Sequence, residues 1–222
     1  MSAEPTLSED IQGDSRWMSM HRRFVSEAKE REPDVVFIGD SLIYHLQHSE
    51  TWRRCFAPLH ALNFGIGGDQ TQHVLWRITN GEMDSFCPKV VVLLVGTNNF
   101  GYPPEQIADG IMANVSAIRR LQPQAFIIVM GLLPRGEKPN ALRERNAATN
   151  RLLSERLSGL ARTQLLADYS ELVSADGTLS HQDMTDYLHL SPQGYKKVFE
   201  PVYDLILDLL NEKECLDGAA AE

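Results

Sequence analysis

Few cysteines, no long apolar run and no cluster of basic residues characterise this sequence of 222 residues. The three cysteines, Cys55, Cys87 and Cys215, are too few and too scattered for a disulfide framework or a zinc knuckle, and they fit a reducing compartment. No stretch approaches the ~20 apolar residues of a membrane-spanning helix. The acidic, polar start MSAEPTLSED lacks the apolar core of a secretory signal. The sequence therefore predicts a cytoplasmic protein that does not span a membrane.

Basic residues are in the minority, because the formal net charge is −9 at pH 7 and Lys and Arg form no run. Nucleic acid and anionic membrane surfaces both attract basic patches, so the sequence predicts no nucleic-acid partner. Nucleotide-binding motifs are missing as well. GIGGDQ at residues 65–70 has Gln70 where G-x-G-x-x-G needs its third glycine, and no G-x-x-x-x-G-K-[ST] is present.

What the sequence does contain is an alternation of apolar runs and amphipathic stretches. Five apolar runs, several rich in Val and Ile, are typical of strands covered on both faces: residues 35–38, 61–64, 90–95, 126–132 and 164–167. Stretches of helical character alternate with them: residues 17–29, 70–80, 105–121, 141–160 and 192–210. The pattern predicts one α/β domain over residues 10–211, with a parallel sheet between helices, and disordered tails at residues 1–9 and 212–222.

The first apolar run ends abruptly in Gly39-Asp40-Ser41, within VVFIGDSL. Ligands of open α/β sheets bind at the carboxyl ends of the strands, which is where Ser41 is expected. Serine is a favoured helix N-cap. A serine at a helix start is also placed where backbone N–H groups favour an oxyanion, so Ser41 is a candidate nucleophile too. The G-x-S-x-G elbow is not present, because Ile43 occupies its last position.

A serine nucleophile needs a base, an orienting acid and donors for the oxyanion. Among the seven histidines, His45 is expected to face solvent and His73 to be a structural residue of its helix. The segment DMTDYLH places Asp186 three residues before His189. One loop could thus set the carboxylate against one ring nitrogen and leave the other free for Ser41. A competing interpretation is a metal cluster whose spacings match no common zinc pattern: His181, Asp183, Asp186 and His189.

Two further blocks follow predicted strands, NFGIGGD at residues 63–69 and GTNN at residues 96–99. The first predicts a turn with positive φ, where glycine lets a backbone N–H approach a ligand closely. The second predicts a turn with Asx-type hydrogen bonds, or an Asn98 side-chain amide aimed into a site. Since all four blocks lie at strand ends or in late loops, one crevice could collect them.

In this order, GDS, GIGGD, GTNN and DYLH resemble the four blocks of the SGNH (GDSL-type) hydrolase family. The resemblance implies a three-layer, flavodoxin-like α/β/α fold with a five-stranded parallel sheet. It implies a catalytic triad of Ser41, His189 and Asp186. It also implies an oxyanion hole formed by the N–H groups of Ser41 and Gly68 and the amide of Asn98. No metal and no cofactor are implied.

Longer stretches, among them PLHALNFGIGGDQTQHVLWR and SHQDMTDYLHLS, resemble the catalytic α subunits of the intracellular type I platelet-activating-factor acetylhydrolases. The likeness runs from about residue 10 to residue 210. It implies a serine esterase that removes the sn-2 acetyl group of platelet-activating factor (1-alkyl-2-acetyl-glycerophosphocholine) and related short-acyl phospholipids. It further implies a homodimer, or a heterodimer with a paralogous catalytic subunit, that binds a lissencephaly-associated WD40 β-propeller protein. The family's VVWVGTNNH block differs here at Leu94 and Phe100, so the pocket shape can differ.

Leu42, Thr97 and Leu188 are the hypothesised lining of a small acyl pocket, which would favour acetyl over longer chains. Leu42 and Leu188 are equally interpretable as core leucines. Two other functions remain open, since a fold does not fix function. The chain could be mainly an interaction subunit for a propeller partner, with weak or dispensable catalysis. It could also be an SGNH acetylesterase that acts on sugar or aryl esters.

Overall fold

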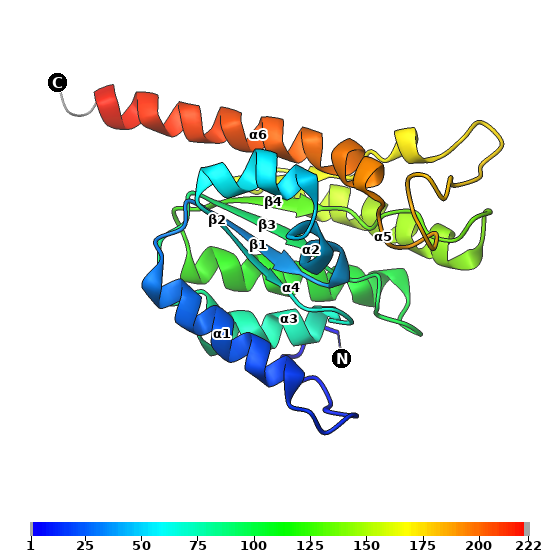
Figure 1. Cartoon of the computed structure of the whole chain (residues 1–222), viewed down its shortest axis with the longest axis horizontal. Coiled ribbons are helices and arrows are strands. Elements are labelled where there is room, and N and C mark those ends of the chain that lie inside the picture. The colour runs from blue at the N-terminus through cyan, green and yellow to red at the C-terminus, as the bar shows by residue number, and fades with distance from the viewer. Residues whose placement is uncertain (1, 220–222) are drawn as a thin grey trace.

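A five-stranded parallel sheet forms the centre of the computed structural model, which describes residues 2–219 and the side chains up to residue 211 (Figure 1). The strand order is β2-β1-β3-β4-β5, and every neighbouring pair is parallel. The strands are β1 (Val35–Gly39), β2 (Ala61–Gly65), β3 (Val90–Leu94), β4 (Phe126–Met130) and β5 (Thr163–Leu166). The predicted five-stranded, flavodoxin-like α/β fold is confirmed.

Both faces of the sheet are buried, which explains why its strands are apolar runs without alternation. In β1, Val36 and Ile38 belong to one hydrophobic core, whereas Val35 and Phe37 belong to the other. All four side chains are 0% exposed. The sheet therefore separates two cores, and each core needs its own layer of helices.

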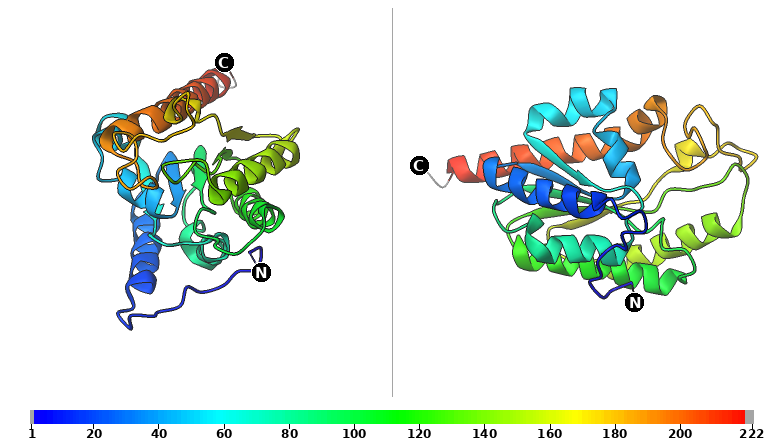
Figure 2. Two further views of the ribbon diagram at one scale, coloured as in Figure 1. Left: turned by 90° about the vertical axis from the view of Figure 1, so that its right-hand side faces the viewer. Right: turned by 60° about the horizontal axis from the view of Figure 1, so that its bottom comes forward.

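The helices form these two layers (Figures 1 and 2). The first layer packs against the core that contains Val36, and consists of α1 (Arg16–Glu30), α3 (Thr71–Arg77), α4 (Pro104–Leu121) and α5 (Ala141–Leu157). The second layer packs against the core that contains Phe37, and includes α2 (Ser41–Leu46), the π-helical turn Trp52–Phe56 and the long helix α6 (Pro192–Ala219). Shorter turns are the 3₁₀ turns Ala57–Leu59 and Ser170–Leu172 and the π-helical turn Ile78–Glu82.

The structure corrects the sequence-based elements in two places. The helix predicted over residues 70–80 is α3 followed by a wider turn, because Asn80 and Gly81 leave helical geometry and Gly81 has a φ of 108°. The helical segment at residues 52–59 was not predicted. Its aromatic side chains Trp52 and Phe56 are buried against Phe37, so tertiary packing holds a segment too short to show helical periodicity.

Both predicted tails remain predictions. Residues 2–9 form no helix or strand, yet Ser2 is buried and its carbonyl oxygen accepts a hydrogen bond from Thr71 Oγ1 at 2.8 Å. At the other end α6 continues to Ala219, beyond the expected domain boundary at residue 211. The side chains of the expected tail at residues 212–222 lie outside the described residues. No helix within residues 2–219 has the length and apolar character needed to cross a bilayer.

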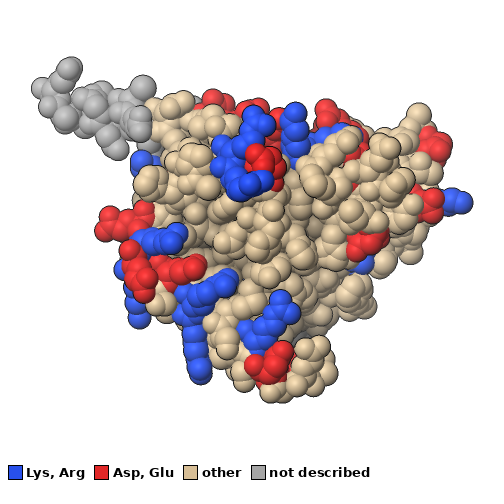
Figure 3. Space-filling view, viewed as in Figure 1, with Lys and Arg blue, Asp and Glu red and all other residues tan. Residues whose placement is uncertain are grey.

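The strand order reverses between β1 and β3, which are neighbours in space although β2 lies between them in the chain. Ligand sites of this fold class lie outside such a crossing point. In Figure 1 the loops that follow the strands gather towards the right-hand side. On the face viewed there, acidic and basic side chains are interspersed (Figure 3).

Candidate active site

Ser41 is the first residue of α2, directly beyond the end of β1. The N-cap is Asp40, which has extended backbone geometry, and its Oδ1 accepts a hydrogen bond from Leu42 N at 3.0 Å. The interpretation of Ser41 as the N-cap is therefore wrong. Because Asp40 caps the helix, the hydroxyl of half-buried Ser41 is free for another partner.

Two glycines allow α2 to start this close to the sheet. A Cβ atom on Gly39 would lie 2.0 Å from Leu94 O, and a Cβ atom on Gly65 would lie 2.2 Å from Tyr44 N. Real side chains do not tolerate such distances, so both strand ends require glycine. The position of Ser41 thus depends on close backbone contacts at the ends of β1 and β2.

The imidazole of His189 reaches Ser41 from a loop at the other end of the chain. Its Nε2 lies 3.1 Å from Ser41 Oγ, and its Nδ1 lies 2.7 Å from Asp186 Oδ2. The backbone N–H groups of Leu188 and His189 donate to Asp186 Oδ1, at 3.0 and 2.6 Å. Tyr187, which follows Asp186, has a φ of 58°, a backbone conformation that residues other than glycine adopt rarely. The loop is thus bent so that its carboxylate and its imidazole meet.

The carboxyl of Asp186 is strongly ionised. Partial burial acts to raise its pKa, but the hydrogen bonds from His189 and from Leu188 N, together with the charge on His189, lower the pKa to about 2. Asp186 is therefore a carboxylate at neutral pH. It can hold the ring of His189 with its Nδ1–H donated to the carboxylate, which leaves Nε2 as the acceptor towards Ser41.

The loops that carry Gly68 and Asn98 are tied to each other beside Ser41. Asn98 Nδ2 donates to Asp69 O at 3.0 Å, and Gln70 Nε2 donates to Asn98 O at 3.0 Å. Gly68 has a φ of 84°, as the predicted glycine turn requires. A Cβ atom on Gly67 would lie 3.9 Å from Ser41 Cβ, which places this loop against the serine.

A buried cluster of charged side chains holds the loop that carries Gly68 in place. Arg77 is 0% exposed, and its Nε donates to Asp69 Oδ2 at 2.9 Å. Its Nη1 donates to Glu82 Oε2, and its Nη2 donates to the carbonyl oxygens of Gly39 and Phe64 at 3.2 and 3.0 Å. One guanidinium therefore links α3 to the ends of β1 and β2. Sequence analysis missed this cluster, since a charged residue in a helix is usually exposed.

The aromatic residues of α1 complete this cluster. Trp17 Nε1 donates to Asp69 Oδ1 at 2.6 Å, and His21 Nδ1 lies 2.9 Å from Glu82 Oε1. Burial raises the pKa of Asp69 to about 6, although Arg77 and Trp17 act to lower it. The aspartate of the GIGGD block is thus held on both oxygens, which fixes the glycine turn before it.

Asp40 is the second buried carboxyl near Ser41. Its Oδ2 has no hydrogen-bond partner among the described residues. Burial raises its pKa to about 7, while the hydrogen bond from Leu42 N and the charge of Arg135 act in the opposite direction. The side chain that caps α2 therefore ionises close to neutral pH.

The three residues of the hypothesised acyl pocket have different environments. Leu42 is 1% exposed and packs in the core beneath α2, and its contribution to an acyl pocket stays a prediction. Leu188 is half-buried and lines a hollow beside Asp186. Thr97 is buried, and its carbonyl and hydroxyl oxygens accept hydrogen bonds from Arg135 Nη1 at 3.0 and 3.1 Å.

The other histidines differ in their relation to the site. His45 is exposed, as expected, but its ring centroid lies 5.4 Å from that of His189 in an edge-to-face contact. His73 Nδ1 accepts a hydrogen bond from Gln70 N at 3.2 Å, and burial lowers its pKa to about 4, which fits the predicted structural role.

The alternative metal cluster does not assemble. His181 is exposed, and Asp183 Oδ2 instead bonds to Lys197 Nζ at 2.8 Å. Among the side chains that the structure describes, no group of three or more His, Cys, Asp or Glu residues is placed to hold a metal ion.

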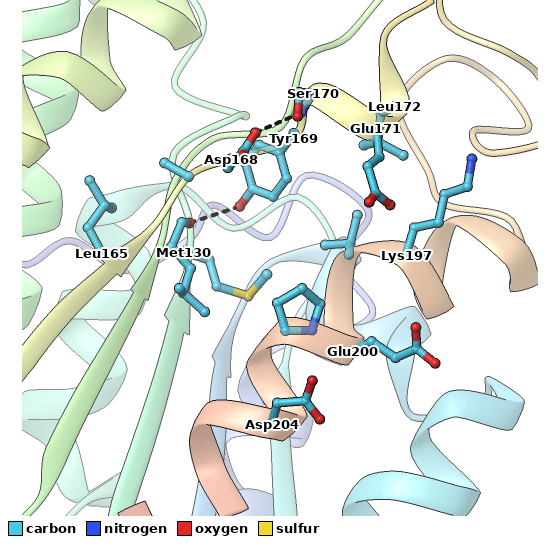
Figure 4. A pocket seen from close by; sticks show the side chains of 14 residues that line it. Met130, Leu165, Asp168, Tyr169, Ser170, Glu171, Leu172, Lys197, Glu200 and Asp204 are labelled. Atoms are coloured by element: carbon cyan, nitrogen blue, oxygen red, sulfur yellow. Dashed lines mark hydrogen bonds between the residues drawn. The ribbon is translucent and has the colours of Figure 1, made fainter. Parts of the chain in front are cut away.

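One partly apolar hollow lies apart from these residues, between β5 and α6 (Figure 4). It measures about 560 Å³, has Met130, Leu172 and Val198 in its wall, and is rimmed by Asp168, Glu171, Glu200 and Asp204. None of the residues predicted for the site lines it. Two smaller hollows instead adjoin Asp186, one of about 360 Å³ with His189 and one of about 280 Å³ with Leu188.

Comparisons with known proteins agree with this geometry. The model of the GDSL-like lipase/acylhydrolase family matches residues 37–197. The chain is 55% identical to platelet-activating factor acetylhydrolase IB subunit alpha2 of Homo sapiens over 211 residues, which cover 95% of this chain and 92% of that protein. It is 52% identical to the IB subunit alpha1 of Bos taurus over 218 residues, 98% of this chain and 94% of that protein.

Solved structures show the same fold at lower identity. A GDSL-like lipase from Bacteroides thetaiotaomicron superposes with a TM-score of 0.63 at 20% identity, covering 83% of this chain and 97% of that one. By fold and sequence the protein is a carboxylic ester hydrolase. The chain belongs to the GDSL-like lipase/acylhydrolase family, as the order of its four sequence blocks predicted.

Proposed function

We propose that the chain is a serine esterase that cleaves the sn-2 acetyl ester of platelet-activating factor and of related short-acyl phospholipids. The observation that carries the proposal is the series of contacts from Ser41 Oγ to His189 Nε2, 3.1 Å, and from His189 Nδ1 to Asp186 Oδ2, 2.7 Å. The substrate is supported by the relatives at 52–55% identity, which are named platelet-activating factor acetylhydrolase subunits.

Acylation begins when His189 Nε2 accepts the proton of the Ser41 hydroxyl while Oγ attacks the acetyl carbonyl carbon. The Asp186 carboxylate holds the ring and stabilises the imidazolium that forms. The tetrahedral intermediate collapses as the C–O bond to the glycerol oxygen breaks, and His189 gives the proton to that oxygen. An acetyl-serine and a lyso-phospholipid result.

The negative charge of the intermediate would be bound by the backbone N–H groups of Ser41 and Gly68 and by the side chain of Asn98. Ser41 N lies in the first turn of α2, where N–H groups have no acceptor within the helix. Asn98 Nδ2 uses one hydrogen in its bond to Asp69 O, so its second hydrogen is available for a substrate oxygen. One such donor typically contributes about 10²–10³ in rate.

Deacylation repeats the same chemistry with water. His189 takes a proton from a water molecule, whose oxygen attacks the acetyl carbon, and then returns that proton to Ser41 Oγ as acetate leaves. Every proton is carried by His189, so the proposed reaction needs no metal or cofactor.

A fluorophosphonate probe tests the nucleophile. We expect one equivalent of probe to label the purified chain at Ser41, and we expect no labelling of the Ser41→Ala variant. Ser116→Ala is the matched control, because Ser116 is an exposed serine on α4. Absence of label on the native protein would instead favour an interaction subunit without catalysis.

The acyl preference tests the substrate. Acetate release from 1-alkyl-2-acetyl-glycerophosphocholine is expected to exceed release of longer acids from the matching 2-acyl lipids. Equal or faster turnover of an acetylated sugar or an aryl acetate would favour the alternative acetylesterase function.

Assembly and location belong to the same proposal. Both relatives are named as subunits, which supports association with a second copy or a paralogous catalytic chain. We propose that this pair then binds a WD40 β-propeller protein. Sedimentation of the chain alone and after mixing with the propeller protein tests both steps. The free thiols of Cys55 and Cys87 fit the proposed cytoplasmic location, which cell fractionation would check.

A further inference from the structure

Two arginines converge on the loop that carries Asn98. Arg135, in the loop after β4, donates from Nη1 to the carbonyl and hydroxyl oxygens of Thr97 at 3.0 and 3.1 Å. Arg145, in α5, donates from Nη1 to Asn99 O at 3.1 Å and from Nη2 to Thr97 O at 3.3 Å. Two positive charges are therefore fixed beside the proposed oxyanion donor.

Neither guanidinium forms an ion pair with a carboxylate, as far as residues 2–211 are concerned. Burial lowers the pKa of Arg145, and the charge of Arg135 lowers it further. Burial also lowers the pKa of Arg135, although Asp186 and Asp40 lie near enough to act against it. Arg77, which is fully buried, instead binds two carboxylates. The pair at Thr97 lacks such compensation and favours an external anion.

Arg135 has donors left for an anion. A guanidinium carries five N–H groups, and only Nη1 of Arg135 is used in hydrogen bonds within the described structure. Nε and Nη2 form the edge that pairs with two oxygens of a phosphate or carboxylate. The side chain is half-buried and lines the 280 Å³ hollow together with Asp186 and Leu188, so the guanidinium lies next to the acid of the proposed triad.

Several apolar side chains lie beside this guanidinium. The ring of Phe100 lies 5.4 Å from Arg135 Cζ and is 56% exposed. Leu142, 38% exposed, and Leu188 line the same hollow as Arg135. Exposed apolar side chains that gather beside a ligand-sized hollow are typical of binding grooves, and their combination with a guanidinium suits a ligand that is both anionic and apolar.

We propose that Arg135, supported by Arg145, binds the phosphate of the ester substrate, and that Phe100, Leu142 and Leu188 contact its alkyl chain. This inference rests on the proposed function and specifies how the same site selects a phosphate-bearing amphiphile over a neutral ester. A guanidinium that only clamps Thr97 would affect all esters alike, whereas a phosphate-binding one affects phosphate-bearing esters selectively.

The test compares two substrates that differ only in the phosphate, 1-alkyl-2-acetyl-glycerophosphate and 1-alkyl-2-acetyl-glycerol. The quantity measured is the ratio of their kcat/KM values. Arg135→Gln is expected to lower this ratio about 10- to 100-fold, the range for loss of one charge-assisted hydrogen-bonded pair. Arg135→Lys keeps the charge without the bidentate edge, and a smaller decrease is expected. Arg151→Gln, an exposed arginine on α5, is the control and should leave the ratio unchanged.

A ratio that stays within twofold of the native value in Arg135→Gln, as judged on folded protein, overturns the proposal. A separate binding measurement keeps it independent of turnover. The Ser41→Ala chain is titrated with a 1-alkyl-2-O-methyl-glycerophosphate, which has no carboxylic ester to cleave. The same titration is made with the double variant that carries both Ser41→Ala and Arg135→Gln. A Kd that rises at least tenfold supports the subsite even if the native chain proves inactive, and an unchanged Kd refutes it. Loss of turnover with retained binding would thus count against the esterase and not against the subsite.

Discussion

Two histidine–carboxylate pairs in this chain have nearly the same geometry and very different surroundings. His189 Nδ1 lies 2.7 Å from Asp186 Oδ2, with side chains that are 32% and 54% exposed. His21 Nδ1 lies 2.9 Å from Glu82 Oε1, with side chains that are 7% and 0% exposed. The distance between ring and carboxylate therefore does not distinguish the pair proposed to be catalytic from the structural one.

The third partner makes the difference. The far nitrogen of His189 faces the hydroxyl of Ser41, which has a proton to give. The far oxygen of Glu82 instead accepts from Arg77, whose charge is permanent. A buried pair next to a guanidinium balances charge, whereas a half-exposed pair next to a hydroxyl can move a proton.

The largest effect is expected for His189→Gln. Removal of the base should lower kcat for an acetyl ester about 10⁴- to 10⁶-fold. The free energy of unfolding should change by less than about 0.5 kcal/mol, because the ring is partly exposed. Steady-state kinetics and urea unfolding measure the two quantities. A large loss of stability would show that this pair is structural as well.

Arg77→Met should have the largest effect on stability. It leaves the carboxylates of Asp69 and Glu82 buried without a counter-charge, which typically costs about 3–5 kcal/mol. Urea unfolding at neutral pH measures the loss. A cost below about 1 kcal/mol would contradict the charge balance described for this cluster.

His21→Leu is the counterpart of His189→Gln in the buried pair. It leaves Glu82 Oε1 without its hydrogen bond, and a loss of about 1–3 kcal/mol is expected. The kcat of the folded protein should stay as in the native chain. A decrease in kcat without a change in stability would show that the His21–Glu82 pair is not purely structural.

A smaller effect is expected for Asp40→Asn, and it depends on pH. The pKa of Asp40 is raised by burial to about 7 from the usual 3.8, so the folded state binds this proton more tightly than the unfolded state. Its contribution to stability is thus present below about pH 4 and is lost as the pH rises towards 7. The slope approaches about 1.4 kcal/mol per pH unit, or about 2 kcal/mol between pH 5 and 6.5.

Asparagine keeps an oxygen for Leu42 N and cannot ionise, so the variant should lose this part of the slope. Asp69, with its pKa raised to about 6, should retain its own part. Thermal unfolding at several pH values between 5 and 8 checks the prediction. An unchanged slope would mean that Asp40 stays ionised in the folded protein.

Sequence patterns predicted the features that depend on one residue type at a time. β1 and β3 were found because burial on both faces demands an unbroken apolar run, and Asp186 and His189 were found because one short loop holds both. The choice between Asp40 and Ser41 as the helix cap was not accessible. Both residue types favour that position, and only the backbone angles decide between them.

Features that depend on several residues distant in the chain could not be predicted from the sequence. Arg77 was placed on a helix, but its burial follows from carboxylates on either side of it and from two strand ends that only the fold brings together. Arg135 had no visible role, because its contact with Thr97 crosses 38 positions of the chain. A charged residue in a sequence is expected at the surface. The sequence does not reveal which charged residues are buried with a partner in the fold.

The glycines at the ends of β1 and β2 restrict how this scaffold can diversify. Since a methyl group at Gly39 or Gly65 would collide with backbone atoms, neither position can be altered without shifting Ser41, the proposed nucleophile. New specificities in this architecture should therefore arise in later loops such as residues 135–142, whereas the segments that hold Ser41 should tolerate little change. An engineer who wants a new specificity should keep the ends of β1 and β2 as they are and vary the later loops.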